Sequence, residues 1–226
     1  MKWYVSTRAR LGLALVGASL MSVVLFGIGA LQNQAWDFWY LMWNLVLAWV
    51  PLLLILWLER ILAHKVWSAW QALVVTFLYL GFLPNAFYVT TDIIHLQEAP
   101  RVDLMYDVVM FSMFVFTSFV IGLVSVYILH AQLRKRVSAT LSWTLVMATL
   151  FLTSFAIYIG RDLRWNTWDV LLNPASILFE VSDGLLHPAS HPELFSITFS
   201  FFVLTSTMYL VAWYAGRTAR QQKLLD

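Results

Sequence analysis

Residues 104–130 read LMYDVVMFSMFVFTSFVIGLVSVYILH, and this stretch decides what kind of protein the chain is. It contains one acidic residue, Asp107, and neither Lys nor Arg. A helix of about 20 apolar residues is long enough to cross the hydrocarbon core of a bilayer. The stretch therefore predicts a transmembrane helix, with Asp107 one turn below one of its ends.

Five further apolar stretches of similar length lie on either side of this one. Of the 226 residues, 61% are hydrophobic and 12% are charged, whereas a soluble domain has about 45–50% apolar and about 25% charged residues. This composition excludes a soluble globular fold. We expect residues 1–226 to form a single membrane domain, an all-α polytopic helical bundle of about six transmembrane helices, with spans near 11–31, 38–58, 66–84, 104–130, 139–159 and 194–215.

The basic residues divide unequally between the two sides that these spans define. Eleven of the 14 Lys and Arg residues fall on one side, and only Arg101, Arg161 and Arg164 fall on the other. Cytoplasmic loops carry the excess of positive charge, so the N-terminus and the C-terminus are expected in the cytoplasm. We interpret the basic loops as orienting the chain and contacting anionic lipid, and we expect no nucleic acid partner.

The first extracytoplasmic segment, residues 85–103, begins after Pro84. Proline disfavours helix at the preceding residue, so the third span is expected to end or bend there, with Asn85 capping the next element. If the residues after Asn85 are helical, Tyr88, Asp92 and His95 share one face. A histidine that is oriented by a carboxylate could transfer protons. The alternative is a polar interfacial helix in which these groups only cap and solvate the chain.

The second extracytoplasmic segment, residues 160–193, carries Arg161 and Arg164 one helical turn apart. Guanidinium groups suit carboxylates and phosphates. These two could bind a lipid headgroup, or they could pair with acidic residues of the protein. Later in the segment, apolar residues recur with helical spacing and predict a short interfacial helix. The acidic candidates for pairing are Asp92, Asp103, Asp107 and Asp169, and Asn166 precedes Asp169 with the spacing of a helix cap.

The remaining histidines suggest less chemistry. His187 and His191 lie four residues apart, which is a spacing found in metal sites, but the prolines around them favour the start of the last span near Pro192. His64 and His130 are expected at the membrane interface. The chain has no cysteine, so a divalent metal such as Mg²⁺, Mn²⁺ or Zn²⁺ would have no thiolate ligand and would need a carboxylate-rich site. The sequence leaves any cofactor unknown.

Several short motifs together resemble a known family of prokaryotic integral-membrane proteins, domain of unknown function thirteen sixty-one. The resemblance extends from about Tyr40 to the last span and implies a bacterial, multi-pass protein of the cytoplasmic membrane, with no established activity. Phe87 stands where a second proline is expected. The motifs are Trp43-Asn44-Leu45 with Pro51, Phe82-Leu83-Pro84-Asn85 with Tyr88, Thr91-Asp92 and His95, Tyr106-Asp107, Gly160-Arg161, Arg164-Trp165-Asn166 and Trp168-Asp169.

These residues coincide with the polar groups that the charge pattern places outside the membrane. The leading hypothesis is an enzyme that acts at the outer leaflet on a lipid-linked or envelope substrate. Two alternatives stay open: a non-catalytic assembly or partner protein whose charges only pair with one another, and a transporter of a small substrate, for which the helix interiors are poor in charge. The expected catalytic residues are His95, Asp92, Tyr88 and Asp107, and the expected substrate-binding residues are Arg161, Arg164, Asn85, Asn166 and Asp169.

Overall fold

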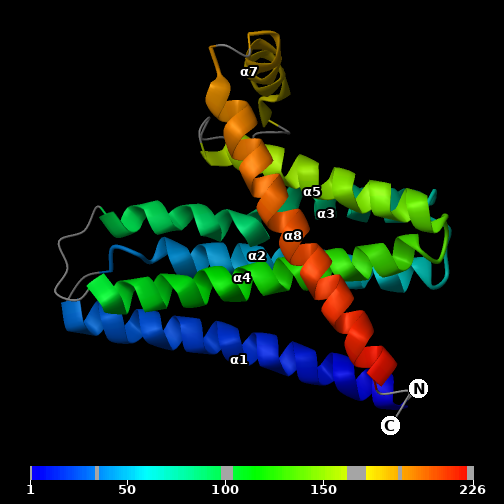
Figure 1. Ribbon diagram of the computed structural model, residues 1–226, viewed down its shortest axis with the longest axis horizontal. Helices are drawn as coiled ribbons and strands as arrows, with labels where there is room; N and C mark the ends of the chain where they lie inside the picture. Colours follow the sequence, from blue (N-terminus) through cyan, green and yellow to red (C-terminus); the bar gives the residue numbers. More distant parts are fainter. Residues whose placement is uncertain (1, 34–35, 98–103, 162–171, 188–189, 223–226) are drawn as a thin grey trace.

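The protein is a bundle of long helices (Figure 1). The computed structural model describes residues 2–33, 36–97, 104–161, 172–187 and 190–222, and these parts of the chain contain no strand. The all-α fold expected from the sequence is therefore confirmed. The elements are α1 (Lys2–Asn33), α2 (Tyr40–Leu62), α3 (Trp70–Tyr88), the 3₁₀ helix η1 (Val89–Gln97), α4 (Leu104–Leu133), α5 (Ala139–Arg161), α7 (Pro174–Leu186) and α8 (Pro192–Gln222).

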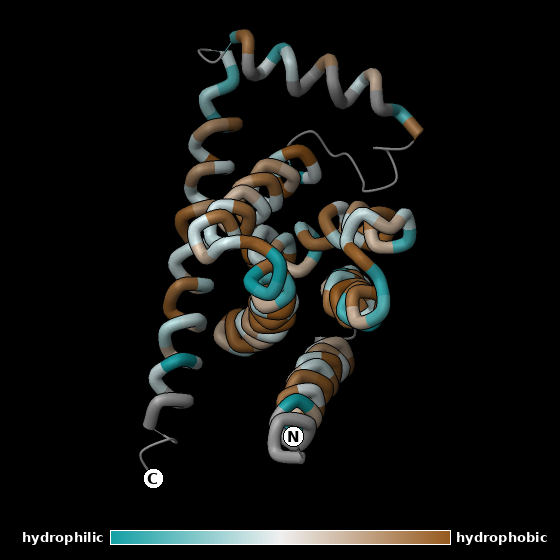
Figure 2. The backbone as a smooth tube through the Cα atoms, turned by 90° about the vertical axis from the view of Figure 1, so that its right-hand side faces the viewer, coloured by the Kyte–Doolittle hydropathy of each residue, from teal (hydrophilic) through white to brown (hydrophobic). Residues whose placement is uncertain are grey.

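Six helical stretches are long and apolar enough to cross a membrane. Their large exposed residues, such as Leu13, Phe77 and Phe199, are what helices facing lipid require, because lipid tails are as apolar as these side chains. Figure 2 shows hydrophobic residues along the helices, with many of the hydrophilic ones near helix ends. The chain is thus a multi-pass membrane protein, and its spans are Arg8–Gln32, Tyr40–Leu62, Trp70–Leu96, Leu104–Leu133, Ala139–Arg161 and Pro192–Thr218.

The helix predicted from residues 104–130 is the centre of the bundle. This helix, α4, contacts α1, α2, α3, α5, α8 and η1, while α8 crosses the other helices obliquely and packs mainly on α5 (Figure 1). The start of α1 and the end of α8 lie on the same side of the bundle (Figure 1). Which of the two sides faces the cytoplasm stays a prediction from the charge distribution.

A glycine allows α3 to lie against α4. A Cβ atom at Gly122 would lie 2.7 Å from Cζ of Phe87 and 3.0 Å from Cβ of Ala86, which is closer than real side chains approach. The Phe87 ring also packs edge to face on Phe119, with centroids 4.9 Å apart. Small residues at helix contacts are typical of membrane bundles, where close packing replaces the hydrophobic effect.

The sequence suggested that the third span ends or bends at Pro84, but the helix continues past this residue. Instead, α3 continues to Tyr88 and η1 runs directly on from Val89 to Gln97, so the span reaches Leu96. A proline inside a membrane helix is tolerated where neighbouring helices satisfy the freed backbone groups, and α2 and α4 both pack on α3. Asn85 accordingly lies inside the helix, and its amide donates to the carbonyl oxygen of Phe82 at 3.1 Å rather than capping a new element.

The interfacial position expected for His130 stays a prediction, but its packing was not expected. Its side chain is fully buried, with Nδ1 2.7 Å from the hydroxyl of Tyr209 and the ring stacked on Trp213 at 4.3 Å between centroids. Both partners come from α8, which crosses α4 at this point, and Trp143 of α5 adds an edge contact at 4.5 Å. His64, by contrast, is exposed as expected.

Polar contacts join three helices at the end of the bundle that holds the turn between α4 and α5, which we call the α4–α5 end. Arg8 of α1 donates to both carboxylate oxygens of Glu59 at 2.7 and 3.1 Å, and Gln132 of α4 donates to the same carboxylate at 2.7 Å. Arg136 then donates to the carbonyl oxygen of Leu62 at the end of α2. We call the opposite end, which carries η1, the η1 end.

The helix predicted within residues 160–193 is present as α7, and the last span begins at Pro192 as expected. The junction between them is held by Asp183, which lies 3.0 Å from Nδ1 of His187 and 3.1 Å from Nε2 of His191. These hydrogen bonds, the one to His191 first, lower the pKa of the Asp183 carboxyl. The two histidines thus share one exposed carboxylate.

Candidate functional site

The 3₁₀ geometry of η1 decides which of its polar side chains lie together. A 3₁₀ helix has three residues per turn, so side chains three positions apart are eclipsed. Asp92 and His95 therefore share one face of η1, and η1 packs on α2, α3 and α4. Tyr88 is the last residue of α3 and lies outside this register.

Asp92 is the buried member of the site. Only 3% of its surface is exposed, and its Oδ2 accepts a hydrogen bond from Nδ2 of Asn44 at 2.7 Å. A carboxylate removed from water needs such donors to stay stable. Asn44 lies one turn into α2, so the pair joins α2 to η1.

His95 contacts the end of α5. Its Nε2 lies 3.3 Å from a terminal nitrogen of Arg161, which is the last residue of α5. A guanidinium has donors and no acceptor, so Arg161 donates and His95 accepts.

Two further interactions enclose this pair. The ring of Tyr40 meets the His95 ring edge to face, with centroids 5.5 Å apart, and the charge of Arg161 acts on the carboxylate of Asp92. Three elements, α2, η1 and α5, thus meet at His95 and Asp92. His95 and Arg161 both stay partly exposed.

The outcome for the residues expected in the site is mixed. The structure brings His95, Asp92 and Arg161 together. Asp107 is buried in the first turn of α4, and Tyr88 accepts a hydrogen bond at its own carbonyl oxygen from Thr91 at 2.8 Å. The expected roles of Asn85, Tyr88 and Asp107 stay predictions, and Arg164, Asn166 and Asp169 lie outside the described residues.

The structure adds two residues to the site that were not expected there, Asn44 and Tyr40. Asn44 had a usable signal, because an amide within an apolar span costs free energy unless it finds a partner. Tyr40 had none, since a tyrosine at the start of a span is typical of the aromatic residues that line a membrane surface. Its contact with His95 depends on how α2 and η1 lie together.

The described residues give the site no metal-binding group. Within the parts of the chain that the structure describes, no set of three or more His, Asp or Glu side chains is placed to hold a metal ion. Asp92 and His95 could supply two ligands, but Arg161 lies against the imidazole nitrogen that would face a cation. This geometry suits an anion better than a cation.

A family model described as "Protein of unknown function (DUF1361)" matches residues 43–206, which is most of the chain. The chain belongs to the DUF1361 family. No curated protein and no solved structure matches it. The matched range contains Asn44, Asp92, His95 and Arg161, so the site lies within the part of the chain that defines the family, and the resemblance seen in the sequence is confirmed.

Proposed function

We propose that this DUF1361 protein is an enzyme of a bacterial cytoplasmic membrane that acts on the extracytoplasmic side, on an anionic lipid-linked or envelope substrate. The observation that carries the proposal is the contact between Arg161 and Nε2 of His95 beside the buried carboxylate of Asp92. This combination offers an anion-binding group and a proton acceptor within one site.

The roles follow from what each group can exchange. An anionic headgroup that reaches Arg161 competes with His95 for the guanidinium, and this frees Nε2 to accept a proton from a hydroxyl group or a water molecule. Asp92, held by Asn44, stabilises the imidazolium that forms and orients it. Tyr88 and Asp107 are expected to assist the reaction, and Asn85, Arg164, Asn166 and Asp169 to contact the substrate.

The test compares the envelope lipids of a strain that lacks the protein with those of the same strain carrying variants. His95→Gln keeps an acceptor for Arg161 but cannot take up a proton. We expect wild type to restore a lipid-linked species that deletion changes, and His95→Gln to fail although it is present in the membrane in equal amount. His64→Gln is the matched control, because His64 is exposed at the other end of the bundle.

Full restoration by His95→Gln would overturn the proposed enzyme. Mass spectrometry of extracted lipids, normalised to the amount of membrane-bound protein, separates a lost reaction from a lost fold. Because His64→Gln alters a histidine remote from η1, its failure to restore would show that any histidine replacement disturbs the protein.

The proposed topology has a separate test that uses the absence of cysteine. Ser190→Cys, between α7 and α8, and Ser68→Cys, between α2 and α3, are both at exposed positions. In intact cells we expect a membrane-impermeant maleimide to label Ser190→Cys and not Ser68→Cys, and to label both after lysis. The reverse pattern would put the site on the cytoplasmic side.

The near-complete burial of Asp92 supports a second candidate, a non-catalytic assembly or partner protein. In that case the Asn44–Asp92 hydrogen bond serves only to join α2 to η1. His95→Gln would then leave the envelope lipids as in wild type, while Asp92→Leu would reduce the amount of protein in the membrane. Quantitative immunoblots of both variants, run beside the lipid analysis, distinguish the two candidates.

A further inference from the structure

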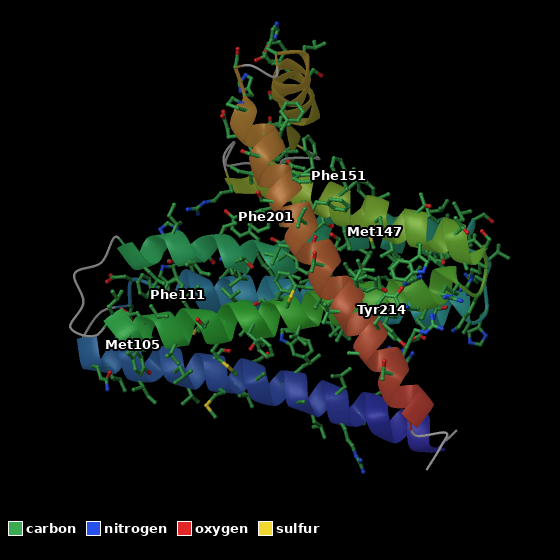
Figure 3. All side chains as sticks on the ribbon, viewed as in Figure 1. Met105, Phe111, Met147, Phe151, Phe201 and Tyr214 are labelled. Atoms are coloured by element: carbon green, nitrogen blue, oxygen red, sulfur yellow. The ribbon has the colours of Figure 1, made fainter. Side chains whose placement is uncertain are left out.

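An apolar groove of about 740 Å³ lies on the side of the bundle where α8 crosses α5. Its lining starts at Ala139, where α5 begins at the α4–α5 end, whereas the candidate site lies at Arg161, where α5 ends. Figure 3 shows Met147 and Phe151 along α5, beside α8. Its lining includes Thr140, Trp143, Thr144, Met147, Phe151 and Phe202.

The length of the groove matches one leaflet of a bilayer. Its lining on α5 runs from Ala139 to Phe151, which at 1.5 Å per residue is about 18 Å. Half of the hydrocarbon core is about 15 Å thick. A single acyl chain that enters at the α4–α5 end therefore extends along the whole groove.

A cation lies at the entrance to the groove. The guanidinium of Arg134 lies over the Trp213 ring, 5.9 Å from its centroid, and Trp213 packs against Trp143 of the groove at 5.3 Å. Arg134 is exposed. The next two cations in the chain contact other groups: Lys135 contacts Gln132 at 3.5 Å, and Arg136 contacts the end of α2.

We propose that this groove binds one anionic phospholipid of the adjoining leaflet, with an acyl chain along α5 and the phosphate on Arg134. The apolar lining and the exposed Arg134 near the α4–α5 end of the groove complement the two parts of such a lipid. Juxtamembrane basic residues attract anionic lipids, and the groove adds a defined place for the chain.

A second copy of the protein is the competing occupant. Thr140, Thr144 and Ala148 recur every fourth residue on α5, and small residues with this spacing allow helices to associate closely in membranes. No charge on this face complements Arg134 within the described residues of the groove, so the lipid fits the surface better.

The test uses the full-length protein in detergent, with native mass spectrometry to count bound phosphatidylglycerol or phosphatidylcholine. We expect wild type to retain one phosphatidylglycerol in preference to phosphatidylcholine. Arg134→Gln should weaken phosphatidylglycerol binding about fivefold, the effect of one cation at an anionic surface, and leave phosphatidylcholine unchanged. Ala148→Trp, at an exposed position that lines the groove, should weaken binding of both lipids.

Arg60→Gln is the matched control, because Arg60 is exposed in the last turn of α2 and does not line the groove. It should bind phosphatidylglycerol as wild type does. Equal retention of the two lipids by wild type, unchanged binding by Arg134→Gln or by Ala148→Trp, or the same loss in Arg60→Gln would overturn the proposal. So would a dimer that Ala148→Trp dissociates and that excludes lipid from this face.

Discussion

Two hydrogen bonds of the same kind and length lie at opposite ends of the bundle. At the η1 end, the amide of Asn44 donates to Asp92 at 2.7 Å; at the α4–α5 end, the amide of Gln132 donates to Glu59 at 2.7 Å. The carboxylates differ in their surroundings. Asp92 is almost fully buried, whereas Glu59 keeps 21% of its side chain exposed and accepts two hydrogen bonds from Arg8.

This difference distinguishes Glu59, which holds helices together, from Asp92, which belongs to the candidate site. Glu59 is partly exposed and forms a direct ion pair with Arg8, and this arginine neutralises its charge. Asp92 has an amide as its hydrogen-bond donor, and the arginine nearby is engaged by His95 instead. A buried charge that is neutralised only at a distance costs free energy, and proteins keep such arrangements chiefly where function uses them.

The largest effect is expected at the η1 end. Asn44→Leu removes the donor to a buried carboxylate, and we expect the free energy of unfolding to fall by about 3 kcal/mol. Unfolding in mixed detergent micelles measures this loss. The double variant Asn44→Leu with Asp92→Leu should recover most of it, because no charge is left unpaired; a double variant as unstable as the single one would contradict this expectation.

The matched change at the other end should cost less. Gln132→Leu also removes an amide from a carboxylate, but Glu59 keeps Arg8 and access to water, so we expect a loss of about 1 kcal/mol. The same unfolding measurement applies. A loss equal to that of Asn44→Leu would mean that burial of the carboxylate does not distinguish the two ends.

A still smaller effect is expected for Glu59→Gln, and it should depend on salt. The pair of Arg8 and Glu59 is partly exposed, and ion pairs of this kind contribute at most about 1 kcal/mol. At about 1 M salt the screening length falls to about 3 Å, so wild type and variant should then unfold alike. A difference that persists undiminished in high salt would indicate a buried pair.

The smallest effect on stability is expected at the junction of α7 and α8, because the carboxylate of Asp183 is exposed. The pKa of Asp183 is lowered from its ordinary value of 3.8 by hydrogen bonds from His191 and His187. A lowered pKa contributes stability above the ordinary value and loses it as pH falls through the folded value. The protection factors for amide hydrogen exchange in α7 should therefore stay constant from pH 5 to about pH 4 and fall below that. The Asp183→Asn variant should lack this decrease.

The positions of the helices could be predicted because each span needs only a continuous apolar run, which is a local property of the sequence. The pairing of residues within the site could be predicted only where they are near in the chain, as for Asp92 and His95. Asn44 and Asp92 are 48 positions apart, and Arg161 and His95 are 66 apart. Their contacts depend on which helices lie side by side, and periodicity does not encode that.

The continuation of α3 past Pro84 and the burial of His130 have the same origin. Pro84 stops a helix in water, where nothing nearby replaces the lost hydrogen bond, but in a bundle α2 and α4 enclose that turn. His130 looks interfacial from its place near the end of a span, yet α8 crosses above it with Tyr209 and Trp213. In both cases packing between helices overrides the local preference of the residue.

The winding of η1 also sets how far it reaches. Its nine residues cover about 18 Å at the 2.0 Å rise of a 3₁₀ helix, whereas an α-helix of the same length would cover about 13.5 Å. Rewinding η1 into an α-helix would shorten it by about 4.5 Å, while Asp92 and His95, three positions apart, would still share a face. The meeting of His95 with Arg161 is therefore tied to the pitch of this one segment.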